Sequence, residues 1–275
     1  MHGRARRTVG LTLIETTLVV ATIALMVGLA LPAVKALVDS FQSEGGTKSI
    51  IQAALNSART MAATHQRYVG VRFQKACTSN DPLDPLKGLL DAPQYMVFIV
   101  HEEPKTLNLA SGFRALEGHE PIKLPDTIGV MDLTRVKSDA DLDEPAELSG
   151  ATTFSIVFSP AGKLVIQNVQ VRNRNGHVDS AANTSVSLDD VFNKKVQVNA
   201  GVGMFYQDDY FGAAWSAYPN LGLGLEASCT SFVLYERQTF RRAYEKKRAW
   251  TEYLRGLSAG TVYVSPYTGD LISPQ

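Results

Sequence analysis

The chain contains few of the residues that build metal and catalytic sites. Its 275 residues include only two cysteines and five histidines, and neither type recurs at the spacing of metal ligands. Serine, histidine and aspartate occur, but no serine stands in a nucleophile-elbow sequence. The sequence therefore indicates neither an enzyme nor a resident metal or cofactor.

The chain also lacks an excess of charge of either sign. Its 27 basic side chains balance 27 acidic ones. A strongly basic domain is the usual electrostatic mark of a protein that binds nucleic acid. Any such binding would therefore have to depend on a local group of charges.

What the chain does have is one long uncharged segment near its N-terminus. Residues 16–34 carry no charge over nineteen positions, and Arg4, Arg6 and Arg7 precede them. At about 1.5 Å per residue, a helix of that length nearly spans a hydrocarbon core of roughly 30 Å. The positive-inside rule then keeps residues 1–10 in the cytoplasm. We therefore expect a single membrane-spanning helix.

Glu15 stands directly before this uncharged segment, within the apolar stretch. A charged side chain in a bilayer costs about 3 kcal/mol or more, so an intramembrane glutamate indicates a function. A secretory signal peptide is the alternative, because it also has a basic start and an apolar core. Glu15 would lie inside that core, and no small-x-small cleavage site follows cleanly, so we favour the membrane helix.

The sequence GLTLIE at residues 10–15 resembles the prepilin signal of type IV pilins and type II secretion pseudopilins. The resemblance implies that prepilin peptidase cleaves after Gly10 and that the new N-terminus at Leu11 is methylated. It also implies that Glu15, the fifth mature residue, pairs with the terminal amine of a neighbouring subunit. Pro32 falls where the family also carries a proline, and there the helix can melt on assembly. A plain kink in a membrane helix is the alternative for Pro32.

The resemblance divides the chain into a leader over residues 1–10, a helical region over 11–66 and a globular head over 67–275. Within the helical region, Gly45 and Gly46 predict a short hinge. An amphipathic helix over 47–66 should follow, because its apolar residues recur at helical spacing. They are Ile51, Ala54, Leu55, Ala58, Met61 and Ala62. We expect an α+β, pilin-like fold, with this helix packed on an antiparallel β-sheet.

Alternating and continuous apolar runs predict the strands of the head. Residues 68–73 form the first, and the apolar run 95–101 should be central in the sheet. Residues 154–158 and 163–171 should form a hairpin across the turn 159–162. Only short strands are expected between residues 104 and 150. Further strands are predicted over 196–202, 232–237 and 261–264.

Short segments of the head resemble H-type minor pseudopilins and the FimT-like minor pilins. They are the Ala58-Arg59 pair with the strand after it, the sequence FSPAGKLV at 158–165, and, more weakly, the Thr-Gly turn within 265–272. The resemblance implies a structural, minor subunit of a secretion pseudopilus or a pilus-like filament. Its partners would be other pilin or pseudopilin subunits, the processing peptidase/methyltransferase and the bacterial inner membrane. The head would lie in the periplasm or outside the cell.

One predicted helix, over residues 240–257, is strongly basic. Its cations include Arg241, Arg242, Lys246, Lys247 and Arg248. They could contact DNA, acidic lipid or a partner subunit. The alternative is an amphipathic helix that covers the sheet with its charges in water. Because FimT-like proteins include DNA-uptake proteins, a DNA- or surface-binding minor pilin at a pilus tip stays open as a second function.

The sequence offers two further candidate sites, an acidic run and a pair of cysteines. The acidic residues 139–144 could bind calcium through their oxygens, but they lack the glycine and spacing of a calcium loop, so a solvated loop is favoured. Cys77 and Cys229 could form one disulfide if the head is exported. Two separate buried thiols are the alternative.

Overall fold

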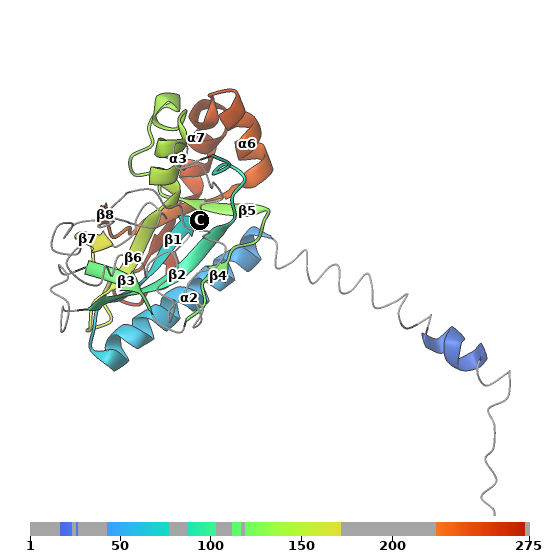
Figure 1. The fold of residues 1–275 in the computed structure, drawn as a ribbon, viewed down its shortest axis with the longest axis horizontal. Coiled ribbons are helices and arrows are strands. Elements are labelled where there is room, and N and C mark those ends of the chain that lie inside the picture. Colours follow the sequence, from blue (N-terminus) through green and yellow to red (C-terminus); the bar gives the residue numbers. More distant parts are fainter. Residues whose placement is uncertain are drawn as a thin grey trace, which may run out of the picture.

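The computed structural model describes residues 17–23, 26, 43–76, 87–102, 112–116, 119–171 and 224–272. Within these residues the protein is a mixed α+β structure whose strands pair mainly antiparallel (Figure 1). The α+β class is therefore confirmed.

Helix α2 (Glu44–His65) begins where Ser43 adopts an extended backbone and its hydroxyl accepts a hydrogen bond from the amide of Gly46. A side chain that accepts such a bond at the N-cap satisfies one of the free amides of the first turn. The helix ends at Gln66, whose φ of 52° places it in the left-handed region. The predicted helix is confirmed, but Gly45 and Gly46 lie in its first turn and do not form a hinge before it. The helical region expected over 11–66 is therefore interrupted at Ser43.

The first sheet is centred on β1 (Val69–Lys75), which pairs antiparallel with β2 (Gln94–Glu102) on one side and with β6 (Phe154–Phe158) on the other. Strand β2 has β1 and β3 as neighbours, which confirms its predicted central place. The short strands are β3 (Gly112–Ala115), β4 (Ile122–Lys123), β7 (Asn168–Val171) and β8 (Gly224–Ala227). The pair β3–β7 is parallel, and β4 pairs with β2 beside the main path.

The predicted hairpin after β6 is only partly formed. Gly162 has a φ of 70° in the turn, and the amide of Val165 bonds to the carbonyl of Val157 at 2.8 Å. Beyond that point the chain leaves β6, and β7 pairs with β3 and β8. The prediction was wrong in its second half because residues 228 and 229 occupy the rest of that edge of β6. Ser228 forms a bridge with Ser155, and the amide of Cys229 bonds to the carbonyl of Ser155.

A second sheet was not predicted. Its order is β11 (Leu271–Ile272), β10 (Val262–Val264), β9 (Ser231–Glu236) and β5 (Ile128–Met131). Residues 232–237 and 261–264 were predicted as strands, and β9 and β10 confirm both. The strand predicted over 196–202 lies outside the described residues.

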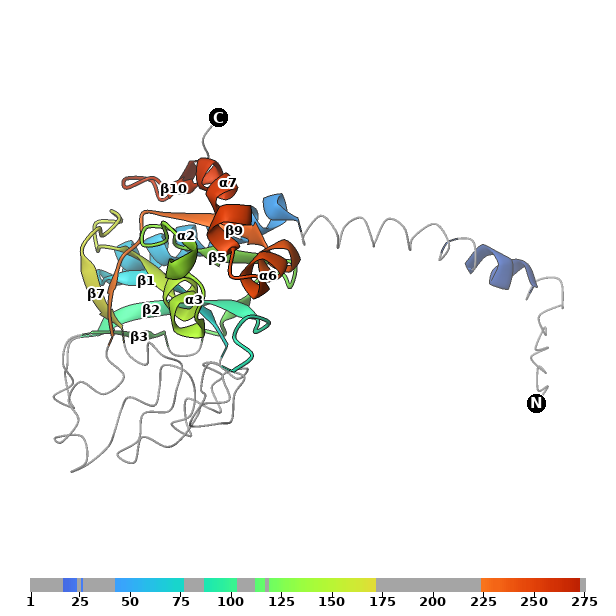
Figure 2. The ribbon, with the colours of Figure 1, turned by 90° about the horizontal axis from the view of Figure 1, so that it is seen from above.

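Short helices gather at one end of the two sheets, and we call them the helical lobe (Figures 1 and 2). They are η1 (Asp139–Asp141), α3 (Pro145–Thr152), α6 (Arg237–Glu245), η2 (Trp250–Leu254) and α7 (Arg255–Leu257), and η3 (Ser258–Gly260) leads out of the lobe to β10. The single helix predicted over 240–257 is broken at Lys247, where φ is 55°. The amides of Lys247 and Arg248 bond back to the carbonyls of Tyr244 and Ala243, which closes α6 in a Schellman motif.

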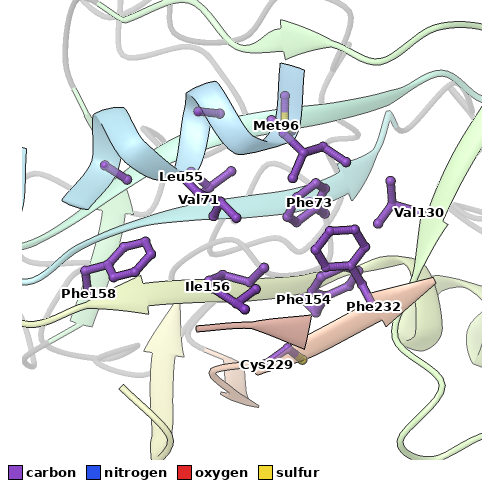
Figure 3. Close-up of a cluster of buried hydrophobic side chains, with 14 of the residues drawn as sticks. Leu55, Val71, Phe73, Met96, Val130, Phe154, Ile156, Phe158, Cys229 and Phe232 are labelled. Carbon is purple, nitrogen blue, oxygen red and sulfur yellow. The ribbon is translucent and has the colours of Figure 1, made fainter. Parts of the chain in front are cut away.

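The main core lies between α2 and the sheets (Figure 3). The predicted stripe of α2 packs there on side chains of β1, β2 and β6, which confirms the predicted packing of helix on sheet. Strands β5 and β9 separate this core from that of the lobe. Phe232 and Leu234 point into the main core, and Val233 and Tyr235 point into the lobe. We call α2 together with the two sheets the sheet body.

Candidate functional site

The predicted processing and assembly residues, Gly10, Leu11, Glu15 and Pro32, lie outside the described residues. Residues 17–23, just after the first three of them, are helical and expose their apolar side chains. Leu18 is 65% exposed and Val20 is 65% exposed. Among the residues that the structure describes, no helix is both long enough and apolar enough to cross a membrane.

Helix α2 has two faces of different chemistry. Its buried face carries the apolar stripe, with Ile51, Leu55 and Ala58 each fully buried. The opposite, exposed side is uncharged and built mostly from small residues, and we call it the outer face of α2. It consists of Ser49, Ala53, Asn56, Ser57, Thr60, Ala63 and Thr64. Residues three or four apart share one side of a helix, so these side chains form a continuous strip.

Arg59, at the border of this strip, connects the three head motifs noted in the sequence. Its Nε donates to the carbonyl of Gly162 at 2.9 Å, and its Nη2 donates to the carbonyl of Tyr267 at 3.0 Å. Gly269 lies close to the same side chain. A Cβ atom added at Gly269 would be only 3.3 Å from Arg59 Cδ and 3.2 Å from the Phe158 ring, so the site has little room for a larger residue. Segments 55–73, 158–165 and 265–272 are thus brought together at one guanidinium.

Gln52 fastens the C-terminal hairpin β10–β11 to the same edge of α2. Its Nε2 donates to the carbonyl of Gly269 at 3.2 Å, and its Oε1 accepts from the amide of Leu271 at 2.6 Å. Pro266 adds a bond, since its carbonyl accepts from the amide of Leu164 at 2.9 Å. The hairpin is therefore held rigidly beside the outer face of α2.

This hairpin exposes several large side chains. Tyr263 is 52% exposed and Ile272 is 53% exposed, and the two residues are paired across the strands. Tyr267 in the turn is 70% exposed, with the Lys163 amine 6.0 Å from the centre of its ring. Rigid, exposed tyrosines are common at protein interfaces. The hairpin thus places exposed tyrosines beside the outer face of α2, together with the charges of Lys163 and Asp270.

The basic residues of the lobe lie beside carboxylates. Arg241 contacts Asp91 at 2.9 Å and Glu245 at 2.8 Å, and Lys246 and Arg248 both contact Glu252. Lys247 lies 3.6 Å from Glu144. Arg242 is exposed on α6. The apolar residues of this segment, including Phe240 and Leu254, fill the core of the lobe. The segment thus covers β9 as an amphipathic layer whose charges are largely compensated.

The carboxylates of the acidic run accept hydrogen bonds from backbone amides. Asp139 accepts from the amides of Trp250 and Thr251, each at 2.9 Å, and also from the Thr251 hydroxyl. These bonds, led by that of the hydroxyl, lower the pKa of Asp139. Asp141 accepts from the amides of Lys137 and Ser138. No group of three or more potential metal ligands occurs among the described residues.

Of the two cysteines, Cys229 is buried in the main core, and its thiol donates to Asp132 Oδ2 at 3.3 Å. Cys77 lies outside the described residues. The disulfide therefore stays a prediction.

No protein family matches this chain, and no curated protein or solved structure is significantly similar to it. Its own residues and their geometry must therefore carry any functional proposal.

Sequence reasoning missed the polar side chains buried where the two sheets and the lobe meet. Gln94 is 2% exposed, and its amide bonds to the amide and carbonyl of Val130 and to the carbonyl of Thr152. Lys75 is 3% exposed and lies beside the turn over residues 87–92. Each occurs at the end of an apolar strand. Polar residues are common at strand ends, so the sequence carried no signal that set these two apart.

Proposed function

We propose that this chain is a structural, minor subunit of a type II secretion pseudopilus or a type IV pilus-like filament. The single observation that carries the proposal is the two-faced helix α2. One face packs on an antiparallel sheet, and the other is small, uncharged and exposed. The helix follows the apolar N-terminal segment in the chain, which is the order that a pilin-like subunit requires.

The outer face of α2 suits helix-to-helix packing for a physical reason. Small side chains let two helices approach closely. An uncharged strip also avoids the cost of burying ions without partners. The tyrosines and Ile272 of the hairpin β10–β11 extend this surface toward a neighbouring subunit. Farther toward the N-terminus, the exposed apolar side chains at 17–23 call for lipid or other subunits around them.

The N-terminal residues supply the assembly chemistry in this proposal. Prepilin peptidase removes residues 1–10 after Gly10 and methylates Leu11, and the apolar segment anchors the mature subunit in the bacterial inner membrane. Glu15 then pairs with the Leu11 amine of the next subunit, because an unpaired carboxylate in hydrocarbon is costly. Pro32 lets the helix adapt as the subunit enters the filament.

The alternative, a DNA- or surface-binding minor pilin, gains less support. It depends on the cations at 241–248, and four of them lie within 4.0 Å of carboxylates. Such pairs reduce the positive field that attracts phosphate. DNA binding by the full-length protein that weakens steeply with salt would favour this alternative.

Ala53→Glu on the outer face of α2 tests the proposal directly. Ala53 is exposed, so the folded head should keep its thermal stability. A charge in a packed helix interface should nevertheless abolish co-purification with filament subunits. Ala146→Glu is the matched control, because Ala146 is exposed in the first turn of α3, where a carboxylate is tolerated, and should assemble normally. If Ala53→Glu assembles as well as the control, the outer face is not an assembly surface.

The N-terminal part of the proposal has its own test. Glu15→Ala should be processed and exported but should co-purify poorly with partner subunits. Gly10→Leu should keep residues 1–10, which mass spectrometry of the membrane fraction would detect. A mature mass in the Gly10 variant would refute the processing step without touching the argument from α2.

A further inference from the structure

Lys75 ends strand β1 with its amine inside the protein. Its Nζ lies 2.9 Å from the carbonyl oxygen of Leu89, 2.8 Å from that of Leu90 and 3.3 Å from that of Ala92. All three carbonyls belong to the turn over residues 87–92. One buried side chain thus fastens the end of β1 to this turn.

The same turn is attached to the helical lobe. Leu89 and Leu90 pack into the lobe core. Arg237, the first residue of α6, donates to the carbonyls of Asp91 at 2.7 Å and Ala92 at 2.8 Å. The turn therefore links the first sheet to the lobe, and the carbonyl of Ala92 accepts hydrogen bonds from two cationic side chains.

The surroundings of Lys75 disfavour its positive charge. Burial is the largest cause and Arg237 the next, and together they lower the pKa of Lys75 to about 7. Asp91 in the turn acts in the opposite direction, but its carboxylate is exposed and contacts Arg241 of α6. Gln94, the register partner of Lys75 on β2, is uncharged. No other charged group is identified against this amine among the described residues.

Three carbonyls match the three N–H donors of an ammonium group, so hydrogen bonding opposes this effect. Each such bond from a charged donor contributes about 1.5–3 kcal/mol, which offsets part of the cost of burying the charge beside another cation. A neutral amine also keeps two N–H donors for the same carbonyls. The closed turn can therefore keep most of its hydrogen bonds when the amine is neutral, which is the form that burial and Arg237 favour.

We propose that Lys75 makes the attachment of the 87–92 turn, and through it of the helical lobe, depend on pH near neutrality. When the amine is protonated, the closed turn holds a buried cation beside the partly buried Arg237, so the turn opens more often to hydrate it. Once the amine is neutral, this cost disappears and the turn closes more tightly. This pH-dependent opening of the turn involves only residues of the head and does not depend on filament assembly.

Hydrogen exchange of the full-length protein tests this pH dependence. Peptides covering residues 87–93 are followed at pH 6.0 and 8.5, with α2 peptides over 51–62 as the internal reference. After correction for the intrinsic pH dependence of exchange, the turn should open roughly 30-fold less often at pH 8.5, because the open state takes up a proton that the closed state loses. The α2 reference should stay constant.

Two variants test whether the pH dependence comes from the Lys75 amine. Lys75→Met should open equally often at both pH values, whereas Lys163→Met, which removes an exposed lysine, should keep the pH dependence. Equal opening of the wild-type turn at both pH values would overturn the proposal, and so would tighter closure in acid. If Lys75→Met does not fold, NMR titration of the wild-type Lys75 amine decides. A midpoint near pH 7 supports the proposal, and one above about pH 9 excludes it.

Discussion

The sheet body and the helical lobe are held together by different kinds of contact. The core of the body consists of apolar side chains from regular elements, such as Leu55 on α2 and Phe73 on β1. The lobe has an apolar core too, but its short helices begin at carboxylates that accept backbone bonds. Asp139 accepts a hydrogen bond from the amide of Trp250 at the start of η2, and Glu236 accepts from the amides of Gln238 and Thr239 in α6. Periodicity thus organises the body, and individual polar contacts organise the lobe.

This difference predicts where the chain tolerates change. In the body, substitutions that keep volume and polarity should cost little, since packing is shared among many neighbours. In the lobe, at its junction with the body and at the edge of α2 that carries Gln52 and Arg59, single polar side chains each hold several backbone groups. Removing one of them leaves those backbone groups without partners, and the loss is largest where the groups are buried, as they are around Gln94.

Gln94→Leu should have the largest effect because Gln94 joins the two regions. The amide and carbonyl of Val130 and the carbonyl of Thr152 would lose their hydrogen-bond partner. We expect the free energy of unfolding to fall by about 4 kcal/mol. The matched control is Gln74→Leu on the neighbouring strand. Gln74 is also buried, but its Oε1 has no hydrogen-bond partner, so the control should be neutral or stabilising. Chemical denaturation measures both, and equal losses would show that Gln94 is not a special junction.

Arg59→Met should loosen the body at one place only. The turns at Gly162 and Tyr267 would lose their shared donor, at about 2 kcal/mol. Hydrogen exchange should rise in residues 262–272 and stay unchanged in α6. Arg59→Lys, which keeps the charge but cannot donate to both carbonyls in the same geometry, should recover only part of the loss. Exchange that rises equally in the lobe would contradict the separation of the two regions.

Asp139→Ala should act on the lobe alone, by about 1 kcal/mol, because it removes the acceptor at the start of η2. The folded-state pKa of Asp139 is lowered, so its contribution is present above about pH 4 and is lost as the pH falls through the folded-state value. The difference in stability between wild type and Asp139→Ala should therefore shrink in strong acid. A difference that stays constant down to about pH 2 would assign the effect to packing and not to the carboxylate.

Lys247→Gly should have the smallest effect and the opposite sign. Lys247 has a φ of 55° at the end of α6, a conformation that glycine adopts without strain. The ion pairs lost with Lys247 are exposed and contribute little. We expect a gain of about 0.5 kcal/mol in the free energy of unfolding. Lys246→Gly, at a right-handed position, should instead destabilise, and thermal melts would distinguish the two.

Periodic patterns in the sequence predicted much of the sheet body. The stripe from Ile51 to Ala62, the central strand β2 and the strands β9 and β10 were all confirmed, because burial on one face or both leaves a pattern in neighbouring residues. The lobe was predicted less well. Helix α3 was missed in a region rich in proline, and the break at Lys247 was missed because no glycine marks it.

The candidate surface was only partly predictable. The motifs around Arg59, Gly162 and Gly269 were each recognised, but their meeting at one guanidinium joins residues more than a hundred positions apart. Of the carboxylates that contact the basic residues of 241–248, Glu245 and Glu252 lie in the same segment of the sequence, but the others do not. Asp91 and Glu144 approach the basic residues only in the folded chain.

By itself, the sequence determined the local elements and the order in which they occur: a basic start, an apolar segment with one carboxylate before it, an amphipathic helix and a set of strands. Those features depend on residues close together in the chain, where periodicity and charge can be read directly. Only the tertiary structure decided that the strands form two sheets, that Lys75 and Gln94 are buried at the junction, and that Asp91 and Glu144 meet basic residues of the lobe. Such contacts join distant parts of the chain, and no local pattern specifies them.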